Sequence, residues 1–132
     1  MLEMGTAPRV LLVEDELLIG VMVADVLAEH GCEVHIAATA KAALEHLICG
    51  APCDVLFTDV NLPGGIDGAA LAQLARKLRP GLPVVYASGG VMAIDQFDAV
   101  EGATFVPKPY DPDKIFALLH RIAPARHHAL EP

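Results

Sequence analysis

Five short strand-like runs, four of them mainly apolar and one alternating, constrain the fold more than any other feature of this 132-residue chain. They occupy residues 9–13, 33–37, 54–59, 83–87 and 103–106. Runs of this length that are rich in β-branched, leucine and aromatic side chains are typical of buried strands. Segments with helical spacing separate them, and such alternation predicts a parallel sheet with right-handed crossovers and helices on both faces.

The segments between the runs predict the helices. We expect helices from after Glu16 to about Gly31, over 40–48, from Asp67 or Gly68 to Leu78, over a short stretch around 93–99, and over 112–122. Gly31 stands where a C-terminal cap is expected, and Asp111 where an N-cap is expected. The apolar stripes predicted to face the core are Ile19, Met22, Val23, Val26 and Leu27 in the first helix, and Ala43, Leu44, Leu47 and Ile48 in the second.

Length and charge limit the class of protein. The chain is expected to form one domain over 9–123, with an N-terminal extension over 1–8 and a flexible tail over 124–132. A formal charge of −8 argues against direct nucleic-acid binding. No apolar run reaches membrane-spanning length, and the first residues lack the pattern of a secretory signal, so a cytoplasmic protein is expected.

Two kinds of site are disfavoured. Cys49 and Cys53 lie near His46, but zinc needs four ligands and no second pair follows, so Cys32 and these two cysteines are expected to be reduced thiols. The cluster of Arg76, Lys77 and Arg79 is expected to be a solvated helix face. No glycine-rich phosphate loop follows the first run, which disfavours nucleotide binding.

The run from Asp54 to Asp59 ends on a single carboxylate and turns at once, because Pro63, Gly64 and Gly65 cannot continue a strand. In open α/β folds the carboxyl edge of the sheet is where ligands bind and chemistry occurs. We therefore predict that Asp59 is a nucleophile that accepts a phosphoryl group.

Polar residues follow four of the five runs. They are Glu14 and Asp15, Asp59, Ser88, and Lys108. The carboxyl ends of parallel strands point the same way, so these side chains are expected to converge. Three crowded carboxylates repel one another unless a cation neutralises them, and hard oxygen ligands suit Mg²⁺, or Mn²⁺ in its place.

The expected roles follow from the chemistry. Asp15 and Asp59 are the predicted direct metal ligands, and Glu14 is predicted to act through water. The free oxygen of Asp59 would attack phosphorus to form an aspartyl phosphate. Ser88 would hydrogen-bond a phosphoryl oxygen, and Lys108 would pair with Asp59 before the reaction and with phosphate after it.

At these residues the chain, over about 9–122, resembles the receiver domain of bacterial two-component response regulators. The resemblance implies a flavodoxin-like fold with strand order 2-1-3-4-5. It also implies a metal ligand from the backbone carbonyl of Asn61 and a cis Lys108–Pro109 bond that aims the lysine inward. A sensor histidine kinase or a histidine phosphotransfer protein is the implied phosphodonor.

The resemblance further implies a switch in which Phe105, three positions before Lys108, rotates inward on phosphorylation. Phe105 can equally be a plain core residue, and both interpretations stay open. Leu18 and Val21 fall outside the core stripe near the acids, and we interpret them as a docking patch for the phosphodonor. The alternative is a helix with two stray apolar side chains.

The chain departs from the common family pattern in three places. Gly64 and Gly65 lengthen the loop after Asp59 by one residue, and two small residues, Gly89 and Gly90, follow Ser88. Space over the phosphate predicts a short-lived phosphoryl group. The short stretch between Gly90 and the last strand makes dimerisation through that region doubtful, so a monomer or weak dimer is expected.

Two rival functions are less consistent with the residues of this site. A phosphatase of the haloacid-dehalogenase kind also uses an aspartate nucleophile, but it needs a general acid two residues later, where this chain has Asn61. A non-phosphorylated binding platform is disfavoured by the complete acid, hydroxyl and lysine set. A signalling module that catalyses only its own phosphorylation and dephosphorylation is the expected function.

Overall fold

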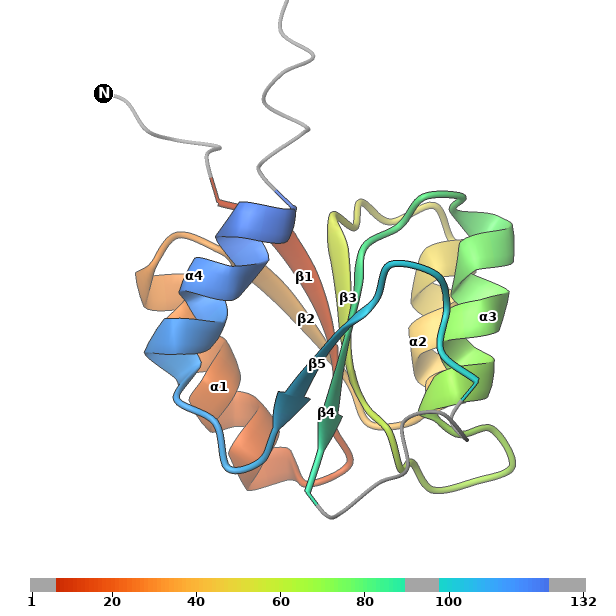
Figure 1. The fold of residues 1–132 in the computed structure, drawn as a ribbon, viewed down its shortest axis with the longest axis horizontal. Coiled ribbons are helices and arrows are strands. Elements are labelled where there is room, and N and C mark those ends of the chain that lie inside the picture. Colours follow the sequence, from red (N-terminus) through yellow and green to blue (C-terminus); the bar gives the residue numbers. More distant parts are fainter. Residues whose placement is uncertain (1–6, 90–97, 124–132) are drawn as a thin grey trace, which may run out of the picture.

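The computed structural model describes residues 7–89 and 98–123, and its centre is one parallel sheet (Figure 1). The strand order is β2-β1-β3-β4-β5, which confirms the order implied by the resemblance. The strands are β1 (Arg9–Val13), β2 (Glu33–Ala37), β3 (Val55–Asp59), β4 (Val84–Ser88) and β5 (Thr104–Pro107). Each lies within one residue of its predicted range at either end.

Four helices cover the sheet in the described part of the chain: α1 (Leu17–Glu29), α2 (Ala40–Ile48), α3 (Gly68–Leu78) and α4 (Pro112–Ile122). Helices α1 and α4 lie on one face, and α2 and α3 on the other (Figure 1). Side chains cap three of them, because the oxygens of Thr39, Asp67 and Asp111 accept backbone N–H groups in the first turn. The short helix expected around 93–99 falls mostly outside the described residues.

Two apolar cores follow from the alternation of side chains along each strand. In β1, Val10 and Leu12 pack toward α1 and α4, whereas Leu11 and Val13 pack toward α2 and α3. All five residues of β3 are buried, as expected for a central strand with helices on both faces.

The helix stripes were predicted less well than the strands. Leu18 and Val21 are 83% and 41% exposed, as expected, but Met22 is 56% exposed and Ile48 is 67% exposed, so their assignment to the core was wrong. In α1 apolar residues occur all round the helix, and spacing alone cannot show which line faces the sheet. Ile48 is the last residue of α2.

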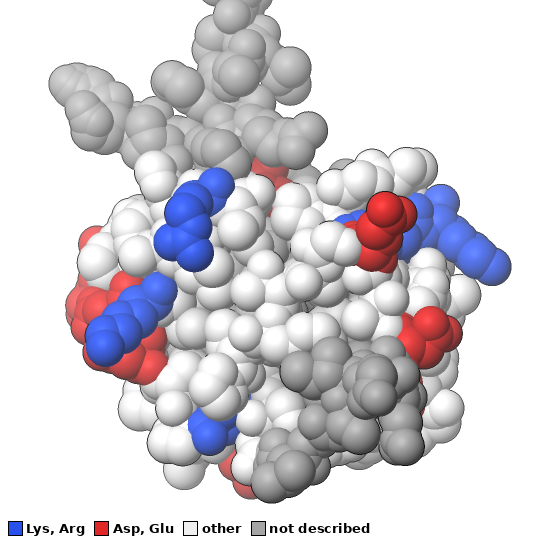
Figure 2. Space-filling view, in the orientation of Figure 1, with Lys and Arg blue, Asp and Glu red and all other residues white. Residues whose placement is uncertain are grey.

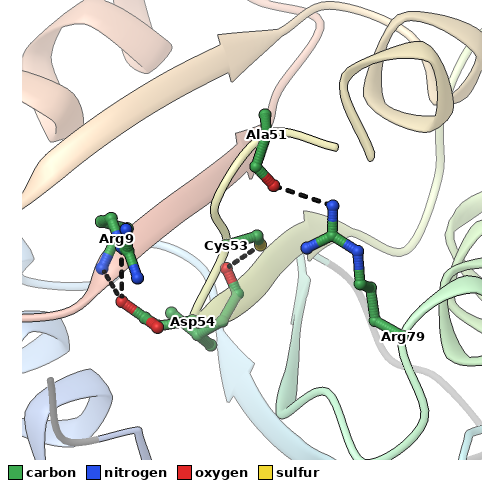
Figure 3. A network of polar contacts seen from close by, with 6 residues as sticks. Arg9, Ala51, Cys53, Asp54 and Arg79 are labelled. Atoms are coloured by element: carbon green, nitrogen blue, oxygen red, sulfur yellow. Dashed lines mark hydrogen bonds and ion pairs between the residues drawn. The ribbon is translucent and has the colours of Figure 1, made fainter. Parts of the chain in front are cut away.

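A network of polar contacts closes the amino end of the sheet (Figure 3). The backbone N–H and side-chain Nε of Arg9 donate to Asp54 at 2.7 Å and 3.2 Å. Arg79 donates to the carbonyls of Leu47 and Ala51 at 3.0 Å and 2.8 Å. The prediction that Arg76, Lys77 and Arg79 form only a solvated face was therefore wrong, because Arg79 ties the end of α3 to the loop that precedes β3.

Charged side chains lie mainly around the margin of the face seen in Figure 2, and uncharged residues cover much of its centre. Within the described ranges no helix has both the length and the apolar character needed to span a bilayer.

Candidate functional site

The carboxyl ends of the strands bring together side chains from distant parts of the sequence. Asp59 is the last residue of β3, Glu14 follows β1, and Lys108 follows β5. The Lys108 amine lies 2.6 Å from Asp59 Oδ1 and 3.6 Å from Glu14 Oε1. The predicted convergence of these strand ends is confirmed.

Three carboxylates meet at this point. Glu14, Asp15 and Asp59 each place an oxygen within 4.8 Å of the other two. Glu14 and Asp59 are buried, at 2% and 5% exposed, whereas Asp15 is exposed. Burial raises the pKa of Asp59 to about 6, and the neighbouring Glu14 adds to the rise while Lys108 opposes it. One lysine therefore does not neutralise the cluster.

The oxygen atoms of the cluster fit a hard divalent cation. Glu14 Oε2 accepts the backbone N–H of Glu16 at 3.1 Å, but Glu14 Oε1 is buried and finds no hydrogen-bond partner among the described residues. A buried carboxylate oxygen in this state is unfavourable, and coordination to a cation, directly or through water, relieves it. The donor set is all oxygen and suits Mg²⁺ or Mn²⁺.

Lys108 is anchored through its backbone as well as its side chain. Its N–H donates to the Ser88 carbonyl at 2.8 Å, which joins the ends of β4 and β5, and the Lys108–Pro109 bond is cis. Burial acts to lower the pKa of the Lys108 amine, but the hydrogen bond and charge of Asp59, helped by Glu14, outweigh it and raise the pKa. The amine is therefore a fixed positive charge at neutral pH.

The remaining predicted residues lie at or near this edge. Ser88 is half-buried at the end of β4, where its neighbour Ala87 pairs in register with Asp59. Asn61 is exposed in the loop that follows β3. Phe105 is half-buried in β5 and contacts the ring of Tyr86, with centroids 5.1 Å apart. Its contact with the core fits either interpretation given above.

One residue near the site was missed by the sequence analysis. Tyr110 follows Pro109, and its ring packs 5.4 Å from that of Phe57. Burial raises its pKa, and the charges of Glu14 and Asp59 add to the rise. Its position two residues after the lysine was the available signal.

Gly68, which the sequence placed at the start of α3, makes a close backbone contact that the sequence did not predict. Its N–H donates to the Val60 carbonyl at 2.8 Å. A Cβ at position 68 would overlap the Asp59 carbonyl oxygen and lie 2.9 Å from the Val60 carbonyl oxygen. Only glycine allows α3 to begin this close to the backbone that carries Asp59.

An apolar hollow lies beside the acidic cluster. Its cavity has a volume of about 300 Å³ and is lined by Ile19, Met22, Val23, Gly89, Lys108, Pro109, Tyr110 and Pro112. It lies between α1 and the start of α4, and the exposed Met22 joins it to the surface of α1 that carries Leu18 and Val21.

Comparison with known proteins identifies the class to which this fold and site belong. The family described as the response regulator receiver domain matches residues 10–120, and the chain belongs to that family. It is 30% identical over 117 residues to the transcriptional regulatory protein TcrA of Mycobacterium tuberculosis, covering 87% of this chain and 46% of that protein. It is 29% identical over 118 residues to the nitrogen assimilation regulatory protein NtrX of Azorhizobium caulinodans, covering 87% of this chain and 26% of NtrX.

Solved structures agree in fold. A response regulator receiver protein from Sinorhizobium medicae superposes with a TM-score of 0.81 at 26% identity, covering 88% of this chain and 94% of that one. The receiver domain of the hybrid histidine kinase CckA superposes with a TM-score of 0.75 at 34% identity, covering 86% and 97%. The chain thus spans half or less of these curated relatives but nearly all of the solved receiver domains.

Proposed function

We propose that the chain accepts a phosphoryl group on Asp59 in a reaction that depends on a divalent cation, and that this modification switches a partner-binding surface. The observation that carries the proposal is the position of the Asp59 carboxylate, 2.6 Å from the Lys108 amine and within the cluster formed with Glu14 and Asp15. Family membership supports the same role. The phosphodonor is a sensor histidine kinase or a histidine phosphotransfer protein.

The residues divide the chemistry among them. Asp15 and Asp59 would hold the cation directly, Glu14 through water, and Asn61 through its backbone carbonyl. When bound, Mg²⁺ or Mn²⁺ supplies positive charge for phosphoryl oxygens and aligns them with the carboxylate. The Lys108 amine is positioned to stabilise charge on the transferring group, and Ser88 to donate a hydrogen bond to it.

Phosphoryl transfer from the donor to Asp59 needs no reactant besides the phosphohistidine and the carboxylate. A free oxygen of Asp59 attacks phosphorus, so an O–P bond forms as the N–P bond of the donor phosphohistidine breaks. The electron pair of the broken bond returns to the imidazole nitrogen. Attack by water on phosphorus later breaks the O–P bond, releases phosphate and restores the carboxylate. In this proposal the chain catalyses only its own phosphorylation and dephosphorylation.

Phosphorylation can be tested directly on the purified chain. Incubation with Mg²⁺ and acetyl phosphate should increase the intact mass by one phosphate, and the gain should vanish in Asp59→Asn or in excess chelator. A mass gain that persists in Asp59→Asn would show that another residue is the acceptor. No gain in the parent chain would instead favour a non-phosphorylated platform, and steady release of phosphate from many added phosphoesters would favour a phosphatase.

We further propose that the apolar surface of α1 docks the phosphodonor. Leu18 and Val21 are exposed, and the exposed Met22 connects them with the hollow beside Lys108. Exposed apolar side chains of this kind next to a reactive group suit the apolar face of a partner helix. The alternative is that these exposed apolar side chains bind no partner.

Charging this surface separates docking from chemistry. Leu18→Glu should slow phosphotransfer from the cognate kinase about tenfold while labelling by acetyl phosphate is unchanged, because a charge on an apolar contact costs about 1–2 kcal/mol. Lys41→Glu, an exposed charge change on α2, is the matched control and should leave both reactions intact. Equal loss of both reactions in Leu18→Glu would contradict the docking role.

The other expectations extend the same proposal. They are a cytoplasmic location and a monomeric or weakly dimeric state. The absence of direct nucleic-acid contact by this chain is a further expectation, and the charge of −8 supports it. The small residue after Ser88 supports a short phosphoryl lifetime. Among the described residues, only the side-chain stem of Lys108 would lie within 4 Å of a Cβ at Gly89. Gly90 lies outside the described residues.

A further inference from the structure

Tyr86 occupies a position from which the phosphorylation site can act on a distant segment. It lies in β4 two residues before Ser88, so the two side chains point to the same face of the sheet. Its side chain is fully buried, with 0% exposed, in the core between the sheet and helices α2 and α3. A tyrosine at such a depth needs a partner for its hydroxyl group.

One partner is the N–H of Val100, which belongs to residues 98–103. We call these residues the β5-leading segment because they end where β5 begins. The N–H of Val100 donates to the Tyr86 hydroxyl oxygen at 3.1 Å in a buried contact. Burial raises the pKa of Tyr86, so the hydroxyl stays protonated and neutral at physiological pH. Val100 itself is 7% exposed and belongs to the same core.

The same ring also contacts β5. Tyr86 and Phe105 are register partners, and their ring centroids lie 5.1 Å apart at 31°. Phe105 is three residues before Lys108, whose backbone is hydrogen-bonded to Ser88. Tyr86 lies in β4, which ends at Ser88, and its ring contacts Phe105 of β5, the strand that Lys108 follows. It is therefore linked to both strands whose ends carry predicted site residues in this half of the sheet.

Two further contacts hold the β5-leading segment from α3. Gln73 donates to the Asp98 carbonyl at 3.0 Å, and Arg76 donates to the Glu101 carbonyl at 3.0 Å. Both are exposed to solvent, where water competes for the same groups, whereas the Tyr86 contact is buried. The Tyr86 contact is therefore the one of the three that is shielded from water, and it originates in a strand of the site.

We infer that Tyr86 couples Asp59 to the β5-leading segment, and that its hydrogen bond to Val100, present in the unphosphorylated chain, is released on phosphorylation. This inference rests on the proposed function. A phosphoryl group on Asp59 draws the Ser88 hydroxyl and the Lys108 amine toward it, which shifts the ends of β4 and β5 around the Tyr86 ring. At 3.1 Å the contact is already near the long end of the useful range, so a shift of a few tenths of an ångström weakens it.

The test follows the Val100 amide by NMR hydrogen exchange in the ¹⁵N-labelled full chain with Mg²⁺. A beryllium fluoride complex serves as the stable phosphoryl substitute, and its ¹⁹F signal reports occupancy of the site. In the parent chain the Val100 amide should exchange at least about tenfold faster once the site is occupied, because a released amide loses its protection. Tyr86→Phe keeps the ring but removes the acceptor, and should exchange rapidly in both states while still binding beryllium fluoride.

Gln73→Ala is the matched control, since it removes a contact to the same segment without touching Tyr86. It should keep the slow exchange of Val100 in the free state and the acceleration on occupancy. A bound ¹⁹F signal with unchanged Val100 exchange in the parent would overturn the coupling but leave phosphoacceptance standing. The same acceleration in Tyr86→Phe as in the parent would also overturn it. No bound ¹⁹F signal in the parent would count against the proposed function itself, and the coupling would fail with it.

Discussion

The two ends of β3 each carry an aspartate, and the surroundings of the two carboxylates differ in kind. At the amino end Asp54 is 7% exposed and faces Arg9, which donates to it from both backbone and side chain. At the carboxyl end Asp59 is 5% exposed and shares the single amine of Lys108 with Glu14. Burial is almost equal, so the number of positive charges and donors for each carboxylate makes the difference.

The amino end of β3 therefore has a structural role, whereas its carboxyl end has the features of a binding site. The amino end is satisfied by the chain itself and holds the loop before β3 in place (Figure 3). The carboxyl end has more negative charge than the chain can neutralise, and one oxygen of Glu14 has no hydrogen-bond partner among the described residues. A bound cation can relieve this excess of negative charge at one end of an otherwise stable sheet.

The largest expected effect comes from adding a side chain where the start of α3 contacts the carboxyl end of β3. Gly68→Ala should lower the free energy of unfolding by at least about 3 kcal/mol, because the added Cβ meets the Asp59 and Val60 carbonyls, which are backbone and cannot move aside. Urea denaturation monitored by circular dichroism measures the change. Gly65→Ala is the control, since nothing lies within 4 Å of a Cβ there, and it should be nearly neutral. Equal stability of the two variants would contradict the close approach.

Removing the satisfied aspartate should have the next largest effect. Asp54→Ala leaves the Arg9 guanidinium and a backbone N–H without their acceptor, and should cost about 2–3 kcal/mol of stability whether or not Mg²⁺ is present. The matched control is Asp113→Ala, which breaks a 2.9 Å contact with His30 where Asp113 is 69% exposed, and should cost less than about 0.5 kcal/mol. If Mg²⁺ restored the stability lost in Asp54→Ala, the amino end of β3 would be coupled to the metal site.

The contrast also explains what the sequence could predict. The strands were predictable because the runs are short and alternate with segments of helical spacing, whereas their order was implied by the resemblance to the receiver family. The meeting of Glu14, Asp59 and Lys108 was predictable for a similar reason, because each ends or directly follows a strand and the carboxyl ends of parallel strands lie at one edge of the sheet.

Other features depended on relations that a linear pattern does not contain. The exposure of Met22 could not be predicted from the sequence of α1, because apolar residues occur on all sides of that helix. The contacts of Arg79 with Leu47 and Ala51 join residues far apart in sequence, and a cluster of basic residues looks the same whether it is solvated or paired. Tyr86 was assigned to a strand, but its hydroxyl contact with Val100 became visible only in three dimensions.

The smallest expected effect concerns the stability of Asp59→Asn relative to the parent chain, which should depend on pH and on Mg²⁺. Because the pKa of Asp59 is raised from 3.8 to about 6 in the folded chain, its carboxyl group favours folding below pH 4 and loses that contribution as the pH rises through 6. Asp59→Asn should therefore be more stable than the parent by about 1–2 kcal/mol at pH 8 in a chelator, and the advantage should shrink toward pH 4.

Adding Mg²⁺ at pH 8 should stabilise the parent more than Asp59→Asn, since only the parent retains the full set of acidic ligands. Urea denaturation at pH 4, 6 and 8, with chelator or with Mg²⁺, supplies the comparison. If Asp59→Asn were less stable than the parent at pH 8 in chelator, Lys108 would be neutralising Asp59 fully. The carboxyl end of β3 would then be as well satisfied as its amino end, and the electrostatic reason for a cation at this site would be lost.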